Sequence, residues 1–337
     1  MVKETITSLD VARAAGVSQS AVSRVFTPGA SVSPTMRQRV EEAANKLGYR
    51  PNALARSLIT GKSRIIGLVL AYLENQFYPD ALEKLSHALQ KRGYHVLVFF
   101  ASDATDNIDA VLEEILDYQV DGIVLASASL SFELAGRCHD AGVPVVLFNR
   151  RQNDEGISYV TSDNYAGGRK LARFLADGGH QRIGYIAGWE GAATQIDREA
   201  GFLAGLSEVN LELFAREVGD YKWELAAEAT RRMFSRKDRP DAVFVANDHM
   251  AFATLEVLRH EFSLRVPDDV SVVSYDDVLL SSWPSFNLTT LRQPINRMVD
   301  ATVEALLARI EEDDTVLRRV AIDGPLVIRG SSRVPRA

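Results

Sequence analysis

The chain has 337 residues, of which 46% are hydrophobic, and its formal net charge is -7 at pH 7. This length exceeds one typical domain, so two or three domains are expected. The acidic total argues against a general nucleic-acid binder, but the charge is unevenly distributed. Residues 1–62 hold nine Lys/Arg against four Asp/Glu, a net +5, whereas the remainder carries -12. A small basic segment ahead of an acidic body suits phosphate contact without unspecific collapse onto nucleic acid.

Several classes of protein are disfavoured by what the sequence lacks. The single cysteine, Cys138, excludes an internal disulfide, and no Cys/His grouping has the spacing of a zinc site, so no metal or other cofactor is expected. Glycine-rich phosphate loops and a serine elbow with a histidine partner are missing, which argues against an enzyme. The N-terminus has no apolar signal peptide and no apolar run could span a bilayer, so a cytoplasmic location is expected.

The run from Thr7 to Val25 predicts two short helices broken at Gly16, the spacing of a DNA-binding helix-turn-helix. Thr7 and Asp10 form a capping pair for the first helix, and Gly16 supplies the left-handed turn that helix ends favour. Ser18 can cap the second helix. The apolar residues of that helix face inward: Ala21, Val22 and Val25. Its polar residues point outward: Gln19, Ser20, Ser23 and Arg24.

A third helix is predicted to open at Ser33 and Pro34, because proline is tolerated at the first helical position. Its apolar stripe completes a three-helix core: Val40, Ala43, Ala44 and Leu47. The basic stretch from Arg50 to Lys62 follows and could form a helix of two turns, a length that is marginal in water on its own.

From Ile65 onward, short apolar runs alternate with amphipathic segments. Strands are predicted at Ile65 to Leu70, His95 to Phe100, Gly122 to Leu125, Val143 to Phe148, Tyr159 to Ser162, Arg182 to Ala187, Ala242 to Ala246 and Val270 to Tyr275. Runs that are apolar on both faces and separated by helices indicate parallel sheets covered on both sides. The chain would pass from a first such sheet to a second near Ser162, and the two sheets would form two lobes with a cleft between them. The predicted class is α/β, with doubly wound parallel sheets behind a helical N-terminal domain.

Sequence motifs occur along almost the whole chain. Near the N-terminus they are Asp10-Val11-Ala12, Ala15-Gly16-Val17-Ser18, Val22-Ser23-Arg24-Val25 and Leu47-Gly48-Tyr49-Arg50-Pro51-Asn52-Ala53. Further on they are Gly142-Val143-Pro144-Val145-Val146, Gly179-His180-Gln181-Arg182-Ile183, Ala246-Asn247-Asp248 and Leu288-Thr289-Thr290-Leu291-Arg292-Gln293. Together they resemble the lactose-repressor/galactose-repressor (LacI/GalR) family of bacterial transcription regulators.

This resemblance implies three parts. They are a helix-turn-helix headpiece over residues 1–50, a hinge helix over 51–62, and a core over 63–337 like a periplasmic sugar-binding protein, where effector binding and dimerisation occur. Within the core, an N-lobe would comprise about 63–162 and 293–325, and a C-lobe about 163–292 and 326–337. The implied function is a sequence-specific transcriptional repressor controlled by a small molecule.

A recognition helix must send polar side chains into the major groove, where each base pair presents a distinct edge. The family match places Gln19, Ser20 and Arg24 at base-contacting positions, and Arg24 is the strongest candidate because a guanidinium can bridge the two acceptors of guanine. The residues expected to hold phosphates or the register of the helix are Thr7, Ser18, Ser23 and Asn52.

In the hinge, the resemblance implies that Leu58 wedges between base steps from the minor groove and that Ala55 lets two hinge helices approach; Arg56 completes the DNA-binding set. One headpiece offers few contacts, so a homodimer on a near-palindromic double-stranded operator is expected.

The ligand site is expected at the carboxyl ends of the strands, between the lobes. Sugar hydroxyls need paired donors and acceptors, and the apolar ring face suits aromatic side chains. The candidate effector residues are Phe77, Tyr78, Asn149, Trp189, Arg198, Tyr221, Asn247, Asp276 and Gln293, with Asp248 beside them. Among these, the resemblance favours Arg198, Asn247 and Asp276 over the aromatics.

Three alternatives stay open at this point. The effector is expected to be a mono- or disaccharide, but the same aromatic and amide groups would also suit a flat purine. An enzyme and an exported sugar receptor are the competing classes of function. The missing catalytic motifs disfavour the enzyme, and the basic N-terminal segment disfavours the receptor.

Overall fold

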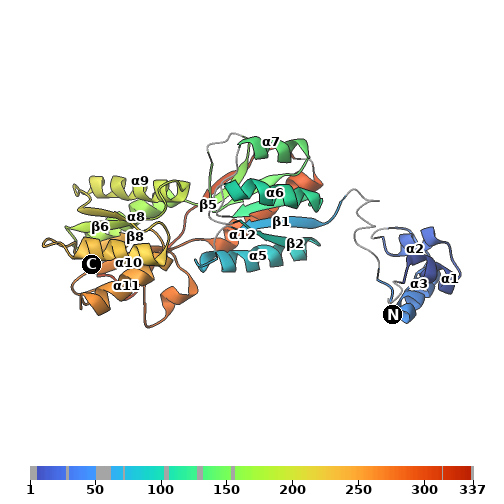
Figure 1. The fold of residues 1–337 in the computed structure, drawn as a ribbon, viewed down its shortest axis with the longest axis horizontal. Coiled ribbons are helices and arrows are strands. Elements are labelled where there is room, and N and C mark those ends of the chain that lie inside the picture. Colours follow the sequence, from blue (N-terminus) through green and yellow to red (C-terminus); the bar gives the residue numbers. More distant parts are fainter. Residues whose placement is uncertain are drawn as a thin grey trace. The chain divides into compact units, whose positions relative to one another are not determined.

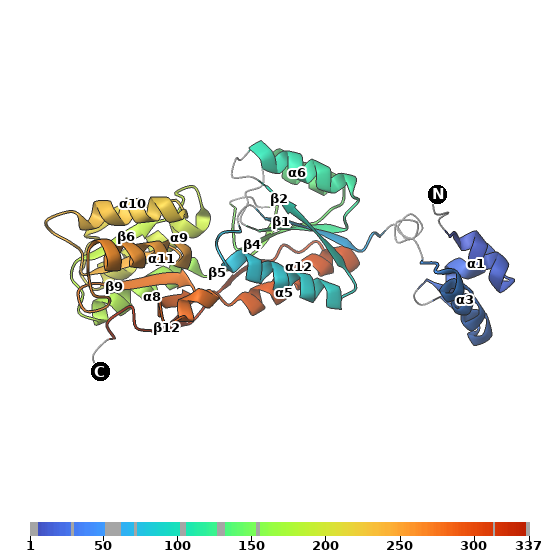
Figure 2. The same cartoon turned by 60° about the horizontal axis from the view of Figure 1, so that its bottom comes forward.

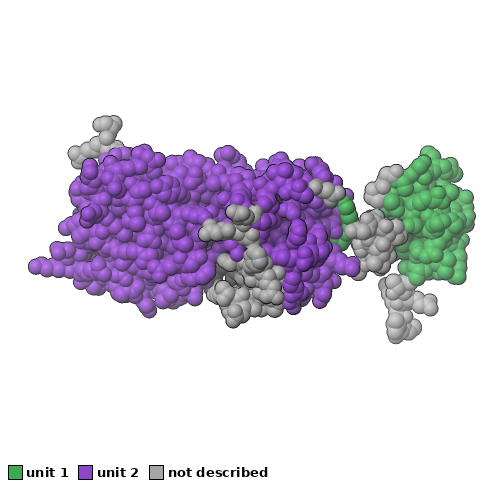
Figure 3. Space-filling view, turned by 90° about the horizontal axis from the view of Figure 1, so that it is seen from above, with its two compact units in different colours: residues 1–63 green, residues 64–337 purple. Residues whose placement is uncertain are grey.

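The computed structural model describes residues 6–27, 30–50, 62–70, 73–101, 106–126, 132–152, 156–312 and 314–334. The chain divides into two compact units, Met1–Ser63 and Arg64–Ala337, which are coloured separately in Figure 3.

The first unit is a three-helix domain formed by α1 (Ser8–Ala15), α2 (Gln19–Val25) and α3 (Pro34–Leu47) (Figure 1). Its small core is aliphatic and lies where the three helices meet: Val11, Ala12, Ala15, Val22, Val25, Val40, Ala43 and Ala44. Ser33 caps α3 and Pro34 opens it, as the sequence predicts. We call the described part of this unit up to Arg50 the headpiece.

The second unit contains two parallel sheets (Figures 1 and 2). The sheet of the first lobe has the order β11-β5-β4-β3-β1-β2. Its strands are β1 (Ile65–Leu70), β2 (His95–Phe100), β3 (Gly122–Ala126), β4 (Val145–Phe148), β5 (Ser158–Ser162) and β11 (Arg319–Ile322). The helices around it are α5 (Phe77–Lys91), α6 (Asp106–Asp117), α7 (Phe132–Asp140) and α12 (Ile295–Glu311).

The sheet of the second lobe has the order β12-β10-β9-β8-β6-β7, and only β12 runs antiparallel to its neighbour. Its strands are β6 (Ile183–Ala187), β7 (Ala215–Val218), β8 (Ala242–Val245), β9 (Ser271–Asp276), β10 (Thr289–Arg292) and β12 (Leu326–Val327). Its helices are α8 (Asn164–Asp177), α9 (Ala193–Glu208), α10 (Trp223–Phe234) and α11 (Asp248–Glu256), with short turns η1 (Val257–Glu261) and η2 (Leu279–Ser282).

Alternating residues of one strand explain why helices cover both faces of the first sheet. On β1, Leu68 packs in the cluster that contains Leu85 of α5 and Leu306 of α12, whereas Val69 packs with Leu112 of α6. Because successive side chains of a strand point to opposite faces, a continuous apolar run needs an apolar partner on each side. The predicted fold class, two doubly wound parallel sheets behind a helix-turn-helix domain, is confirmed.

The strand prediction was incomplete in two respects. Val143 and Pro144 precede β4 instead of belonging to it. In addition, β7, β10, β11 and β12 were missed; β7 and β11 are short, carry arginine, and lie at sheet edges, where the apolar signal is weak. Three connections pass between the lobes: β5 to α8, β10 to α12, and β11 to β12.

Candidate functional site

Two capping interactions set the start of the helix-turn-helix. The Thr7 backbone N–H donates to Asp10 Oδ2 at 3.0 Å and the Asp10 backbone N–H donates to Thr7 Oγ1 at 3.4 Å, so the predicted capping box is present. Gly16 ends α1 with a φ of 64°, and Arg39 Nη2 of α3 donates to the Ala15 carbonyl at 2.6 Å. These contacts fix the angle at which α2 leaves the turn.

The sequence of α2 separates the helix into an apolar and a polar face. Ala21, Val22 and Val25 are buried as predicted. The outward side chains are all exposed: Gln19, Ser20, Ser23 and Arg24, with the cap Ser18 beside them. Within the described residues, Arg24 has no ion pair, whereas Gln19 Nε2 donates to Ser8 Oγ at 2.9 Å. In the described part of the headpiece, α2 therefore presents an exposed polar face that carries the Arg24 guanidinium.

The structure places the predicted DNA-binding residues in two groups. Thr7, Ser18 and the polar residues of α2 are all exposed on the headpiece, at the start of α1 and along α2. Four others lie outside the described residues: Asn52, Ala55, Arg56 and Leu58.

In the second unit, Asp276 at the end of β9 is the centre of a buried polar cluster. Its carboxylate accepts from Gln293 Nε2 at 2.7 Å and from Asn75 Nδ2 at 3.1 Å, and Arg198 Nη2 lies 3.6 Å away. Asn75 belongs to the first lobe and precedes α5, so this carboxylate links the two lobes directly. Burial raises the pKa of Asp276, and Arg198 and the two amides counteract part of that shift.

Arg198 projects from α9 and is almost fully buried. Its Nε donates to Asn164 Oδ1 at 2.8 Å, its Nη1 donates to the Ala246 carbonyl at 2.6 Å, and its guanidinium lies 3.8 Å from the centre of the Tyr275 ring. Burial alone would lower its pKa, but the Asp276 carboxylate and nearby tyrosines raise it above the usual value. This arginine is a fixed cation that joins α8, α9 and the end of β8.

The first lobe contributes aromatic and amide side chains from the carboxyl ends of its strands. Phe77 stacks on Phe148 with ring centroids 6.2 Å apart and meets Tyr78 edge-on at 5.4 Å. Asn149 follows β4, and its Nδ2 donates to the Tyr78 hydroxyl at 3.4 Å. All four side chains are buried. The predicted residues Phe77, Tyr78 and Asn149 are therefore brought together.

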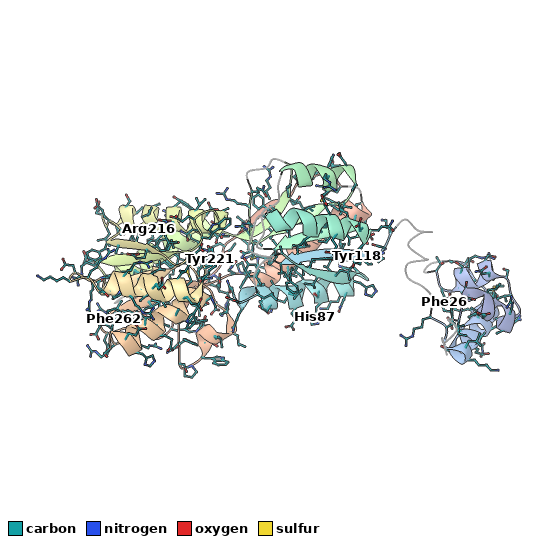
Figure 4. All side chains as sticks on the ribbon, viewed as in Figure 1. Phe26, His87, Tyr118, Arg216, Tyr221 and Phe262 are labelled. Carbon is teal, nitrogen blue, oxygen red and sulfur yellow. The ribbon has the colours of Figure 1, made fainter. Side chains whose placement is uncertain are left out.

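Backbone strain coincides with the candidate residues. Asn149, Tyr221 and Asp276 have φ angles of 56°, 59° and 128°, values that L-residues rarely adopt. Such conformations cost of order 1–3 kcal/mol each and persist where the surrounding structure holds them, frequently at ligand sites. Figure 4 labels Tyr221 on the side of the second lobe that is next to the first. Three separate loops thus store strain around one set of polar groups.

Two amide oxygens of the cluster accept no hydrogen bond within the described residues: Asn149 Oδ1 and Gln293 Oε1. Their residues are 5% and 2% exposed, so bulk water does not replace a partner. A buried acceptor without a donor is costly, and a ligand hydroxyl or N–H would satisfy it.

Three other predicted residues differ in their surroundings. Trp189, 41% exposed, has the Arg150 guanidinium 5.1 Å above its ring. The Tyr221 hydroxyl lies 3.4 Å from Thr194 Oγ1. Asn247 is 2% exposed and caps α11, because its Oδ1 accepts from the Met250 N–H at 3.0 Å. The side-chain oxygen of Asn247 therefore stabilises the start of α11.

Asp248 proves to be a structural carboxylate. It accepts from the Val278 N–H, the Ser281 hydroxyl and the Thr290 hydroxyl at 3.0, 2.6 and 2.7 Å, and so holds η2 and β10 in place. Burial, together with the Asp276 charge, raises the pKa of Asp248 to about 7 despite these bonds. Both of its oxygens therefore accept structural hydrogen bonds, so Asp248 supports the fold and not a ligand.

Sequence reasoning missed three members of the buried cluster: Asn75, Arg150 and Asn164. Arg150 and Asn164 each lie two residues after a strand of the first lobe, close to the position that singled out Asn149. That signal was available for Arg150 and Asn164. The role of Asn75 depends on Asp276, 201 residues away in sequence, and no local pattern predicts it.

No helix among the described residues is long and apolar enough to cross a membrane, and the same residues hold no group of three or more potential metal ligands.

Comparison with known proteins gives two family matches. Residues 7–52 match "Bacterial regulatory proteins, lacI family", and residues 172–332 match "Periplasmic binding protein-like domain". The ribose operon repressor of Escherichia coli (strain K12) is 31% identical over 331 residues, covering 97% of this chain and 99% of its own.

Two solved structures are similar over almost the whole chain. A complex of the transcriptional regulator CelR with cellobiose is 30% identical, with a TM-score of 0.74, over 97% of this chain and 99% of that one. The lac repressor dimer bound to operator and the anti-inducer ONPF is 27% identical, with a TM-score of 0.88, over the same shares of the two chains. These relatives are transcriptional regulators, not enzymes.

Proposed function

Because the chain belongs to the lacI family of bacterial regulatory proteins, we propose that it is a sequence-specific repressor whose affinity for operator DNA is controlled by a sugar bound in the core. The observation that carries the ligand half of this proposal is a pair of unsatisfied, buried amide oxygens: Gln293 Oε1, beside the Arg198–Asp276 pair, and Asn149 Oδ1, beside Tyr78. The exposed polar face of α2 supports the DNA half.

On DNA, α2 would lie in the major groove. Arg24 is the candidate guanine reader, with Gln19 and Ser20 as further base contacts and Thr7, Ser18 and Ser23 on phosphates. The lac repressor structure is a dimer on its operator, which supports a homodimer and a near-palindromic site here. Such a regulator acts on the chromosome and would therefore work in the cytoplasm.

In the core, the donors and acceptors have the pattern that vicinal hydroxyls need. A hydroxyl can donate to Asn149 Oδ1 or Gln293 Oε1 and accept from Arg198, and Phe77, Tyr78, Trp189 and Tyr221 can cover the apolar face of a sugar ring. The names of the ribose and cellobiose relatives support this class of ligand. A purine is the alternative occupant and is tested in the same assay.

We assign a role to each part of the chain: residues 1–50 form the DNA-binding headpiece, residues 51–62 the hinge, and residues 63–337 the core that binds the ligand. In the core we assign about 63–162 and 293–325 to one lobe, and about 163–292 and 326–337 to the other. A ligand that binds one arrangement of the lobes more tightly shifts the protein toward that arrangement and so changes its affinity for DNA. The size of this change is limited by the difference in ligand affinity between the two arrangements.

The test combines two screens on the full chain. Selection from a random-sequence duplex pool is expected to enrich near-palindromic duplexes whose affinity falls steeply with salt. A thermal-shift screen of pentoses, hexoses, disaccharides and nucleobases is expected to give stabilisation by a saccharide, which must also change the affinity for the enriched duplex. Absence of any enriched duplex would refute the DNA half, and stabilisation by nucleobases alone would replace the sugar by a purine.

A further inference from the structure

Arg64, the first residue of the second unit, is held through both its backbone and its side chain. Its backbone has a φ of 58°, a strained value for an arginine. Its N–H donates to Asp121 Oδ2 at 3.0 Å, and its carbonyl accepts from the His95 N–H at 2.7 Å. The backbone of this residue is therefore tied to both strands next to β1, at the point where the chain enters the core.

The side chain of Arg64 adds a second attachment. Nη1 donates to Glu311 Oε1 at 2.9 Å, and the guanidinium lies 4.8 Å from the centre of the Tyr94 ring. The Tyr94 hydroxyl donates to the same Glu311 oxygen at 3.1 Å, although the ring itself is only 1% exposed. Arg64, Tyr94 and Glu311 form a closed triangle of contacts, which we call the entry anchor.

Both helices that reach the entry anchor start at the ligand cluster. Glu311 is the last residue of α12, and Gln293, which donates to Asp276, lies two residues before that helix begins. Tyr94 lies just after α5, which starts at Phe77, directly beyond Asn75. The two helices pack side by side in the first lobe (Figure 2). At 1.5 Å per residue, the 17 residues of α12 span about 25 Å.

From this arrangement we propose that Arg64 is a positioning residue for regulation: the entry anchor passes displacements of α12 and α5, driven from the ligand cluster, to the peptide that leads to the headpiece. The proposal rests on the proposed function.

The physical reason is mechanical. A packed helix moves as a unit, whereas a loosely attached peptide absorbs a displacement of the core without transmitting it. Arg64 is attached firmly instead: it has a strained backbone, two backbone hydrogen bonds, one ion pair and one ring contact. Loss of the anchor should therefore weaken coupling while leaving both binding sites intact.

A double-mutant cycle on full-length protein tests this without a known effector. The probe is the duplex that the wild-type protein enriches from a random-sequence pool, and the readout is its dissociation constant by fluorescence anisotropy. Gln293→Ala perturbs the far end of α12 and is expected to change this constant about fivefold or more. In the Arg64→Ala background, the same substitution is expected to change it less than about twofold. Asp276→Asn serves as a second perturbation if Gln293→Ala does not fold.

The matched control is Arg318→Ala. Arg318 pairs with Glu304 of α12 at 2.9 Å and with Asp314 at 3.4 Å, and its side chain is partly exposed, as that of Arg64 is, but it does not lie where the chain enters the core. A structural effect of losing an ion pair to α12 would appear in the Arg318→Ala background as well, whereas loss of coupling should appear only with Arg64→Ala and with Glu311→Gln.

Two results would overturn the proposal: a Gln293→Ala effect that is equally large with and without Arg64, or no effect of Gln293→Ala on duplex affinity in an otherwise wild-type chain. Failure to enrich any duplex is a different result, because it refutes the DNA half of the proposed function itself.

Discussion

The headpiece carries its candidate recognition groups on the surface, whereas the core encloses most of its candidate ligand-binding groups in the interior, with the exposed Trp189 as an exception. The polar side chains of α2 are exposed, so they need no partner within the folded headpiece: Gln19, Ser20, Ser23 and Arg24. Arg198 and Asp276 are 3% and 4% exposed and are held by hydrogen bonds, a ring contact and a strained backbone. DNA would contact side chains that are already exposed. A ligand of the core, by contrast, would replace hydrogen bonds of buried groups that also stabilise the fold. Binding in the core is thereby tied to conformation.

The strongest test of this contrast removes the buried cation. Arg198→Ala leaves the Asp276 carboxylate without its cation and removes the bonds to Asn164 and Ala246, so we expect a loss of about 3–5 kcal/mol in the free energy of unfolding. Urea unfolding followed by circular dichroism measures it. Arg231→Ala is the matched control, because Arg231 makes two short bonds to Glu261 at the surface, where little change is expected. Equal losses in the free energy of unfolding of the two variants would show that the buried arginine contributes no more to stability than the surface arginine.

A second test concerns the close packing that places Arg198. A Cβ added to Gly201 of α9 would lie 2.0 Å from the Tyr165 carbonyl oxygen of α8, so Gly201→Ala must push the two helices apart. We expect a loss of about 3 kcal/mol by urea unfolding, together with weaker binding of the saccharide found in the thermal screen.

Gly136→Ala provides the control for this test. Gly136 lies within α7, and a Cβ there would meet nothing within 4 Å. Alanine should stabilise that helix by about 0.5–1 kcal/mol. If Gly201→Ala were as benign as Gly136→Ala, the position of Arg198 would not depend on the contact between α8 and α9.

The same contrast explains what could be predicted from the sequence. The helix-turn-helix is contiguous, so the Thr7–Asp10 capping box, the turn at Gly16 and the inward residues of α2 were all predicted correctly from local spacing. The ligand cluster is assembled from loops far apart in the chain. Its polar members were found where they follow an apolar strand, as with Asn149. Asn75 was missed because its partner is set by the packing of the two lobes, which no local pattern encodes.

A smaller effect is expected from the surface. Arg24→Ala should leave the stability unchanged, because the side chain is exposed and has no partner in the described part of the chain. It should lose about 1–3 kcal/mol of discrimination at one base-pair position, measured by competition with single-base variants of the selected duplex. Lys46→Ala, an exposed cation on α3, is the control and should weaken all duplexes alike or none. Uniform weakening by Arg24→Ala would assign Arg24 to phosphate contact instead.

The smallest effect tests whether a headpiece residue can serve both fold and DNA. Thr7 caps α1 and is also a predicted phosphate contact, whereas Ser33 caps α3 without a predicted role on DNA. Loss of either cap should cost about 1 kcal/mol, seen as faster amide hydrogen exchange in the helix concerned. Thr7→Ala should also weaken duplex binding but leave its salt dependence unchanged, because a neutral hydroxyl releases no counterions, and Thr7→Ser should restore the affinity. If Thr7→Ala and Ser33→Ala weaken duplex binding equally, the loss comes from headpiece stability alone, and the hydroxyl of Thr7 makes no contact with the phosphate backbone.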